Sequence, residues 1–177
     1  MRRLMLFRHA KTETDSPSGQ DVDRRLDDRG RHDSALMGAW LNSHPPHPDM
    51  VCVSTAVRTR QTWDLIAAAM PSVKPVVEHI EELYVAELPE ILTVIRDAAV
   101  HDPRQLMLIG HNPGLHEMAL GLIKDGDPAG RKALAGNLPT GSLVVIDFAI
   151  ENWNDIAFRS GTLATFVSPK LLKESHQ

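Results

Sequence analysis

Short runs of apolar residues recur along the chain, and the longer stretches between them carry apolar residues at helical spacing. Runs of this kind are typical of strands that are buried on both faces of a parallel sheet. Segment 73–77 is interrupted by Pro75, so it predicts an edge strand or a loop rather than a central strand. The clear strands are predicted at residues 4–7, 50–53, 105–109, 143–148 and 163–167.

The stretches between the predicted strands favour helices. Asp27 or Asp28 can cap the first helix, and Pro89 suits the first turn of a later one. Residues 78–86 have the character of a loop, and one short helical piece is expected around residues 131–135. Residues at helical spacing within 35–41, 58–66, 91–98 and 115–123 mark the main helices; the first ends at Asn42, the second runs until Pro71, and Asp102-Pro103 closes the third.

This alternation of strands and helices predicts one α/β domain over residues 1–177, a layered sandwich whose central, mostly parallel sheet is flanked by helices. A hydrophobic content of 42% and a charged content of 24% are ordinary for a globular domain. The net charge of -4 gives no reason to expect nucleic acid or a membrane as a partner. The apolar run before Arg8 is too short for a signal peptide, so we expect a cytoplasmic protein.

Basic side chains follow several of the predicted strands. Arg8 and His9 end the first strand, and His111 comes two residues after the strand that ends at residue 109. Arg58 lies one turn into the helix that follows Ser54. The carboxyl ends of parallel strands meet at one edge of the sheet, so these four side chains should surround one pocket. Guanidinium groups and helix N-termini both favour a phosphate group there.

Several common phosphate and metal sites have no match in the sequence. There is no Gly-rich loop that ends in Lys-Ser or Lys-Thr, no Gly-x-Gly-x-x-Gly after the first strand, and no Gly-x-Ser-x-Gly elbow. His44 and His47 lie in a proline-rich turn without a nearby cysteine, which is a poor metal site. We therefore expect a site without metal or cofactor, in which a histidine itself accepts a phosphoryl group.

Several motifs together resemble the histidine phosphatase superfamily, and most closely its SixA-type phosphohistidine phosphatase branch. The resemblance implies a phosphoglycerate mutase-like fold. Arg25 stands where the family commonly has proline, and Thr55 departs from a usual Ser-Pro. The matching segments are Arg8-His9-Ala10-Lys11-Thr12, Asp23-Arg24-x-Leu26 with Gly30, Ser54-x-x-x-Arg58-x-x-Gln61-Thr62, Gly110-His111-Asn112-Pro113-Gly114, Leu138-Pro139-Thr140-Gly141 and Ser168-Pro169-Lys170.

The resemblance also implies roles for individual residues. His9 would be the nucleophile, neutral at the attacking nitrogen while its other ring nitrogen donates to a backbone carbonyl. Arg8 and Arg58 would hold the non-bridging phosphate oxygens, and His111 would donate a hydrogen bond to one of them. Catalysis would then depend mostly on positioning and electrostatics.

The proton donor is less well defined by the sequence. Glu82 resembles the position from which some branches supply a carboxylic acid, yet Glu81 and Glu82 could equally be solvated loop charges. Lys11 and Arg24 are candidates for the rim of the pocket. The other histidines have no partner spacing that singles them out; they are His32, His79, His101, His116 and His176.

Three functions remain in competition. The first is a phosphatase that removes phosphate from phosphohistidine in a protein, such as a phosphorelay histidine domain. The second is a phosphatase for a small phosphomonoester. The third is a phosphate- or phosphoprotein-binding module with little turnover, which would have had no need to keep Arg8, His9, Arg58 and His111 together.

Overall fold

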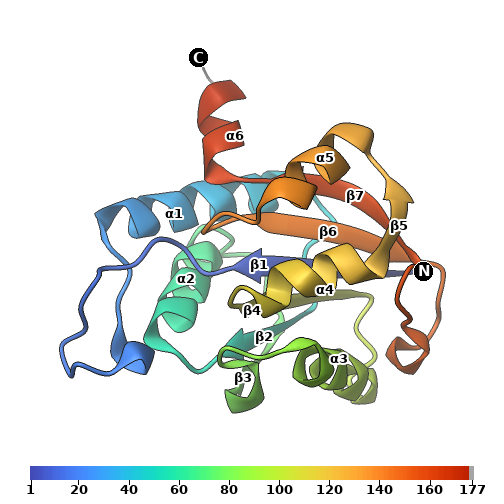
Figure 1. Ribbon diagram of the computed structural model, residues 1–177, viewed down its shortest axis with the longest axis horizontal. Helices are drawn as coiled ribbons and strands as arrows, with labels where there is room; N and C mark the ends of the chain where they lie inside the picture. Colours follow the sequence, from blue (N-terminus) through green and yellow to red (C-terminus); the bar gives the residue numbers. More distant parts are fainter. Residues whose placement is uncertain (176–177) are drawn as a thin grey trace.

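The computed structural model describes residues 1–175, so the expectation for His176 lies outside the described part of the chain. A seven-stranded sheet forms the centre of this part, in the order β3-β2-β4-β1-β6-β7-β5 (Figure 1). Only β6 runs against its neighbours. The strands are β1 (Arg2–Arg8), β2 (Met50–Ser54), β3 (Val76–Ile80), β4 (Gln105–Gly110), β5 (Ile123–Gly126), β6 (Leu143–Phe148) and β7 (Gly161–Val167).

Helices cover both faces of this sheet, as Figure 1 shows. On one face, Met37 and Leu41 of the first helix and Trp63 and Ile66 of the second pack on alternate residues of β1, β2 and β4. The opposite residues of the same strands pack under the third and fourth helices. The helices are α1 (Asp28–Ser43), α2 (Val57–Ala68), α3 (Leu88–Asp97), α4 (Gly114–Leu122), α5 (Pro128–Gly136) and α6 (Pro169–Ser175). The predicted three-layer α/β sandwich is therefore confirmed.

The three central strands read as continuous apolar runs because both of their faces are covered. Every residue of β2 is buried, and Leu106 to Gly110 of β4 are buried as well. Each fully buried leucine or isoleucine contributes about 1.5–3 kcal/mol by leaving water. The apolar runs thus reflect strands that are covered on both faces.

The edges of the sheet differ from the sequence expectation. The edge strand β3 begins at Val76, after Pro75, and runs to Ile80, so the loop expected over residues 78–86 is wrong at its start. β5 and α6 were not predicted, and α5 is longer than the short helical piece expected around residues 131–135. These elements are short and carry few apolar residues, so contacts with the rest of the fold, such as the pairing of β5 with β7, define them rather than their own pattern.

Two close backbone contacts hold the site end of the sheet together. Asp27 caps α1 by accepting from Gly30 N at 2.7 Å, and a Cβ on Gly30 would lie 2.0 Å from Lys11 O. A Cβ on Gly114 would likewise lie 2.0 Å from Ala86 O. Glycine at these positions lets α1 and α4 begin directly against the loops that follow β1 and β3.

Within residues 1–175, no helix combines the length and the apolar content that crossing a membrane requires.

Candidate active site

Register places the two central histidines side by side. In the parallel pair β1 and β4, Arg8 lies opposite Gly110, so His9 and His111 follow at the same level. Their ring centroids are 5.4 Å apart. Together with Arg8, Arg58, Lys11 and Arg24 they line a pocket of about 480 Å³ at the carboxyl ends of the strands. Six of the seven side chains expected at the site therefore converge, and the seventh, Glu82, does not.

The ring of His9 has a defined orientation. Its Nδ1 lies 2.7 Å from the carbonyl oxygen of Ala10, and because a carbonyl only accepts, Nδ1 carries the proton. Burial, together with the nearby charges of Arg58 and Arg8, lowers the pKa of His9 to about 4. The imidazole is therefore neutral near pH 7, with the lone pair on Nε2, which is the form required of a nucleophile.

Each of the two central arginines is held by part of its guanidinium group. Arg8 donates from one Nη to Leu138 O at 3.0 Å. Arg58 donates from both Nη atoms to Asp21, to the backbone oxygen at 2.9 Å and to Oδ2 at 3.0 Å. The Nε of each arginine is buried and has no partner within the described chain. Both side chains are thus oriented while further N–H donors of each guanidinium remain for an anion.

His111 is oriented by the end of β2. Its Nε2 lies 2.7 Å from Ser54 Oγ, which also accepts from Ala56 N at 3.4 Å. The Ser54 hydroxyl can therefore donate to Nε2, which assigns the proton of neutral His111 to Nδ1. Burial and the neighbouring His9 lower the pKa of His111 to about 3. Its Nδ1 is buried without a partner, so it is a third free donor.

Buried polar atoms without a partner distinguish the pocket from the rest of the described chain; three are N–H donors and one, Asn112 Oδ1, is an acceptor. Of seven buried side-chain nitrogen or oxygen atoms without a partner in residues 1–175, four belong to residues that line it, namely Arg8, Arg58, His111 and Asn112. An unpaired buried polar group costs about 1–3 kcal/mol, so such a cluster destabilises the fold unless water or a ligand satisfies it. Three N–H donors beside a neutral histidine suit a phosphoryl group, whose oxygens accept hydrogen bonds.

The structure adds two residues that sequence reasoning missed. Asp21, in the 3-10 turn before Arg24, accepts at Oδ2 from Arg58 and also from the Tyr84 hydroxyl. These bonds, that of Tyr84 foremost, lower the pKa of Asp21 to about 2. The Tyr84 ring in turn meets His111 edge-on, with centroids 5.5 Å apart. No spacing in the sequence links Asp21 to Tyr84, because loop closure brings them together.

Basic side chains surround the mouth of the pocket, and all of them have acidic partners. Lys11 lies 3.1 Å from Asp27, and Arg24 lies 3.2 Å from Asp21. Arg29, which the sequence did not single out, also lines the pocket. Such exposed pairs are weak and exchange readily, so these cations remain available to a second anionic group.

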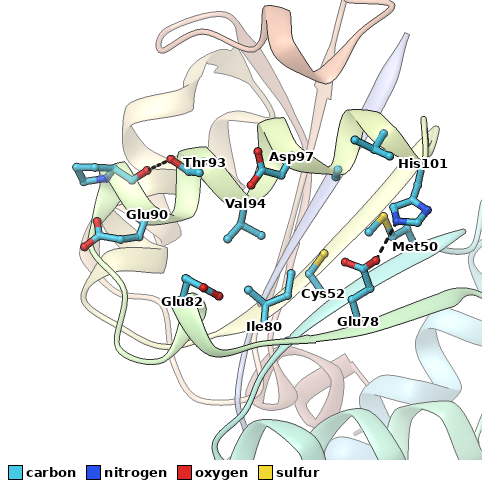
Figure 2. A pocket seen from close by; sticks show the side chains of 13 residues that line it. Met50, Cys52, Glu78, Ile80, Glu82, Glu90, Thr93, Val94, Asp97 and His101 are labelled. Atoms are coloured by element: carbon cyan, nitrogen blue, oxygen red, sulfur yellow. Dashed lines mark hydrogen bonds and ion pairs between the residues drawn. The ribbon is translucent and has the colours of Figure 1, made fainter.

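Glu82 occupies a different place from the one that the resemblance suggested. The 3-10 turn of residues Glu81–Leu83 directs it to a separate cavity between β3 and α3 (Figure 2). The structure thus does not bring Glu82 to the phosphate pocket. In residues 1–175, no group of three or more His, Cys, Asp or Glu side chains is arranged to hold a metal ion.

Comparison with known proteins agrees with this geometry. Residues 4–90 match the model of the histidine phosphatase superfamily (branch 1). An uncharacterized protein of Mycobacterium leprae is 30% identical, with 93% of this chain and 100% of that protein covered.

Two solved structures designated phosphohistidine phosphatase SixA resemble this one over nearly the whole chain. The protein from Nakamurella multipartita is 29% identical, with a TM-score of 0.80 and coverage of 95% of this chain and 96% of that one. The protein from Agrobacterium tumefaciens is 28% identical, with a TM-score of 0.78 and coverage of 95% and 98%. The chain therefore belongs to the histidine phosphatase superfamily, in its SixA-like branch.

Proposed function

We propose that this phosphatase removes phosphate from phosphohistidine in a protein, through an intermediate in which His9 carries the phosphoryl group. The observation that supports this most strongly is the neutral, oriented His9 beside three buried donors without partners. The relatives designated SixA support the same substrate class.

In the first step, the lone pair on His9 Nε2 attacks phosphorus while the bond from phosphorus to the substrate nitrogen breaks. The guanidinium groups of Arg8 and Arg58 and the ring of His111 donate to the non-bridging oxygens and stabilise the charge spread over them. The electron pair of the broken bond returns to the leaving imidazole. Water then attacks phosphorus from the opposite side as the bond to His9 Nε2 breaks. The electron pair of that bond returns to Nε2, and a water proton passes to a phosphate oxygen, so the products are dihydrogen phosphate and neutral His9.

The absence of a free acid favours an imidazole leaving group over an alkoxide. Among the described residues that line the pocket, Asp21 is the one carboxylate, and its pKa of about 2 keeps it ionised near pH 7. An alkoxide needs a proton donor in the transition state. A phosphohistidine that is protonated at its other ring nitrogen leaves as neutral imidazole without one.

The mouth of the pocket is also compatible with a substrate as large as a protein. Val85 lines the pocket and is 53% exposed, and Lys11 and Arg24 form the rim beside it. A phosphohistidine side chain could therefore reach His9 while the rest of its protein stays outside.

A substrate panel tests the proposal. Phosphate release is measured with EDTA present from a phosphohistidine protein, from the same protein carrying phosphoserine, and from p-nitrophenyl phosphate. We expect kcat/KM for phosphohistidine to exceed that for phosphoserine by about 10²–10⁴-fold, the usual contribution of a general acid. Equal values for the two proteins would contradict the substrate assignment.

A small phosphomonoester with a good leaving group is the second candidate, because a pocket of about 480 Å³ is of the size that holds small ligands. Hydrolysis of p-nitrophenyl phosphate alone would favour it. Tight phosphate binding without turnover of any substrate would instead identify a binding module.

A further inference from the structure

A second cavity of about 660 Å³ lies outside the active site, between the edge strand β3 and helix α3. Its floor is apolar and consists of Met50 and Cys52 of β2, Ile80 of β3, Val94 of α3, and Ala98 in the 3-10 turn that follows α3. Carboxylates stand around this floor, as Figure 2 shows: Glu82 and Glu90 at one end, Glu78 at the other, and Asp97 above. We call this cavity the acidic groove.

Most of the charge in the acidic groove is uncompensated. Glu78 pairs with His101 at 2.9 Å. Glu82, Glu90 and Asp97 make no hydrogen bond or ion pair through their side chains with any other residue among 1–175. Like charges around an apolar floor repel one another, and a cation that carries apolar groups would relieve this repulsion.

The acidic groove and the active site are neighbours along the chain. Glu82 lines the groove, and Val85, three positions later, lines the phosphate pocket. Val85 is 53% exposed and has φ 42°, a left-handed backbone conformation that a β-branched residue rarely adopts. Strain of this kind persists where the surrounding structure imposes it, often at sites that contact a ligand.

Exposed apolar side chains continue the floor of the groove toward the solvent. Val100, which lines it, is 88% exposed, and Val76 of the edge strand is 49% exposed. Val76 lies on the same face of β3 as Glu78 and Ile80, because side chains alternate along a strand. The apolar surface of the groove is thus open to solvent at its side. An open surface of this kind suits a peptide segment better than a small molecule that must be enclosed.

We propose that the acidic groove binds a basic, apolar segment of the phosphorylated substrate protein, while its phosphohistidine enters the adjacent pocket. The proposal rests on the function proposed above, because it assigns a second contact to the same substrate. Charge complementarity supports it: the pocket, with Arg8, Arg24 and Arg58, attracts the phosphate, and the groove attracts cations on the same protein.

A pair of synthetic phosphohistidine peptides tests this assignment. One carries lysine and leucine residues that begin about three positions, or about 10 Å of extended chain, from the phosphohistidine. The other has glutamate in place of each lysine. We expect the basic peptide to have a kcat/KM about tenfold higher at low salt, and the difference to shrink as salt is added.

The protein variants locate the effect. In Glu82→Gln/Glu90→Gln/Asp97→Asn the preference for the basic peptide should disappear, and in Glu82→Lys/Glu90→Lys/Asp97→Lys it should reverse. Hydrolysis of p-nitrophenyl phosphate should stay unchanged in both variants. Glu174→Lys is the matched control, because Glu174 lies on α6, on the far side of the molecule from α3 (Figure 1).

Each outcome decides the proposal. No preference in the wild type, or a preference that survives both triple variants, would overturn it, and so would an equal loss of p-nitrophenyl phosphate hydrolysis. If neither peptide is hydrolysed while p-nitrophenyl phosphate is, the phosphohistidine function fails instead. In that case, binding of the unphosphorylated basic peptide is measured by fluorescence anisotropy. Binding to the wild type that is lost in the triple variants would support the groove as a peptide site, and no binding to the wild type would refute it.

Discussion

The phosphate pocket and the acidic groove lie on either side of one short segment, residues 82–85, yet they are built differently. The pocket presents donors that are buried and held in place, such as Arg58 by Asp21 and His111 by Ser54. The groove presents exposed carboxylates on flexible side chains over an apolar floor. Chemistry needs preorganised groups, whereas recognition of a protein surface tolerates adaptable ones.

Removing the nucleophile should give the largest effect. It should abolish catalysis in the phosphate pocket and leave binding at the acidic groove intact. In His9→Ala we expect kcat to fall by at least about 10³-fold with every substrate, because no other group can carry the phosphoryl intermediate. Binding of the basic peptide to the groove should be unchanged. His44→Ala, at an exposed histidine, is the control. Retained turnover in His9→Ala would contradict the mechanism.

Arg58→Lys should have the next largest effect. Lysine keeps the charge but has no forked guanidinium. It cannot contact Asp21 through two nitrogens and still offer another donor to the phosphate, so kcat/KM should fall by about 10²–10³-fold. Arg60→Lys, at an exposed position two residues along α2, should behave like wild type. Equal activity of Arg58→Lys and wild type would show that charge alone is sufficient.

Asp21→Asn and Tyr84→Phe test whether the orientation of Arg58 matters. Each removes part of the contact that holds the guanidinium, and we expect kcat to fall by about tenfold with KM less affected. Because both act through Arg58, the double variant should lose little more than either single one. Independent, multiplying losses would show that the two residues do not act as a unit.

The buried histidines should also make the protein sensitive to acid. The pKa of His9 is about 4 and that of His111 about 3, below the value of about 6.5 in an unfolded chain. Between these values the unfolded chain binds more protons, so the free energy of unfolding falls as pH is lowered from about 6.5 toward 4. Urea denaturation at about pH 7 and about pH 5 measures this loss, which His111→Asn should reduce. An unchanged loss would contradict the assigned shifts.

Glu82→Gln should have the smallest effect on small substrates. Glu82 lines the groove and not the pocket, so kcat for p-nitrophenyl phosphate should stay within about twofold of wild type. Loss of a general acid would instead lower kcat by about 10²–10⁴-fold. A loss of a hundredfold or more would return Glu82 to the role of proton donor.

The sequence was most informative where local pattern and position in the sheet coincide. Apolar runs identified β1, β2 and β4 as strands, and the polar residues that end them predicted that Arg8, His9, Arg58 and His111 would meet. The cap of α1 could be narrowed to Asp27 or Asp28, because capping involves residues only three apart, and the structure has it at Asp27.

What the sequence could not provide depends on contacts between distant segments. Asp21 reaches Arg58 and Tyr84 only because the loop after β1 folds over the sheet edge. Glu82 resembled a proton donor in sequence, but the turn after β3 directs it to the other side of the segment. A resemblance carries the residue type over to a position; backbone geometry decides which cavity the side chain enters.

The central claim is that His9 carries the phosphoryl group, and rapid quenching with ³²P-labelled phosphohistidine protein tests it most directly. The account predicts a labelled enzyme whose bond is labile in acid and stable in alkali, as a phosphoramidate is, with the label mapped to His9. The label should be absent from His9→Ala and present in His44→Ala. Phosphate release without any labelled enzyme, under conditions that trap other phosphohistidines, would contradict the account and indicate direct attack by water.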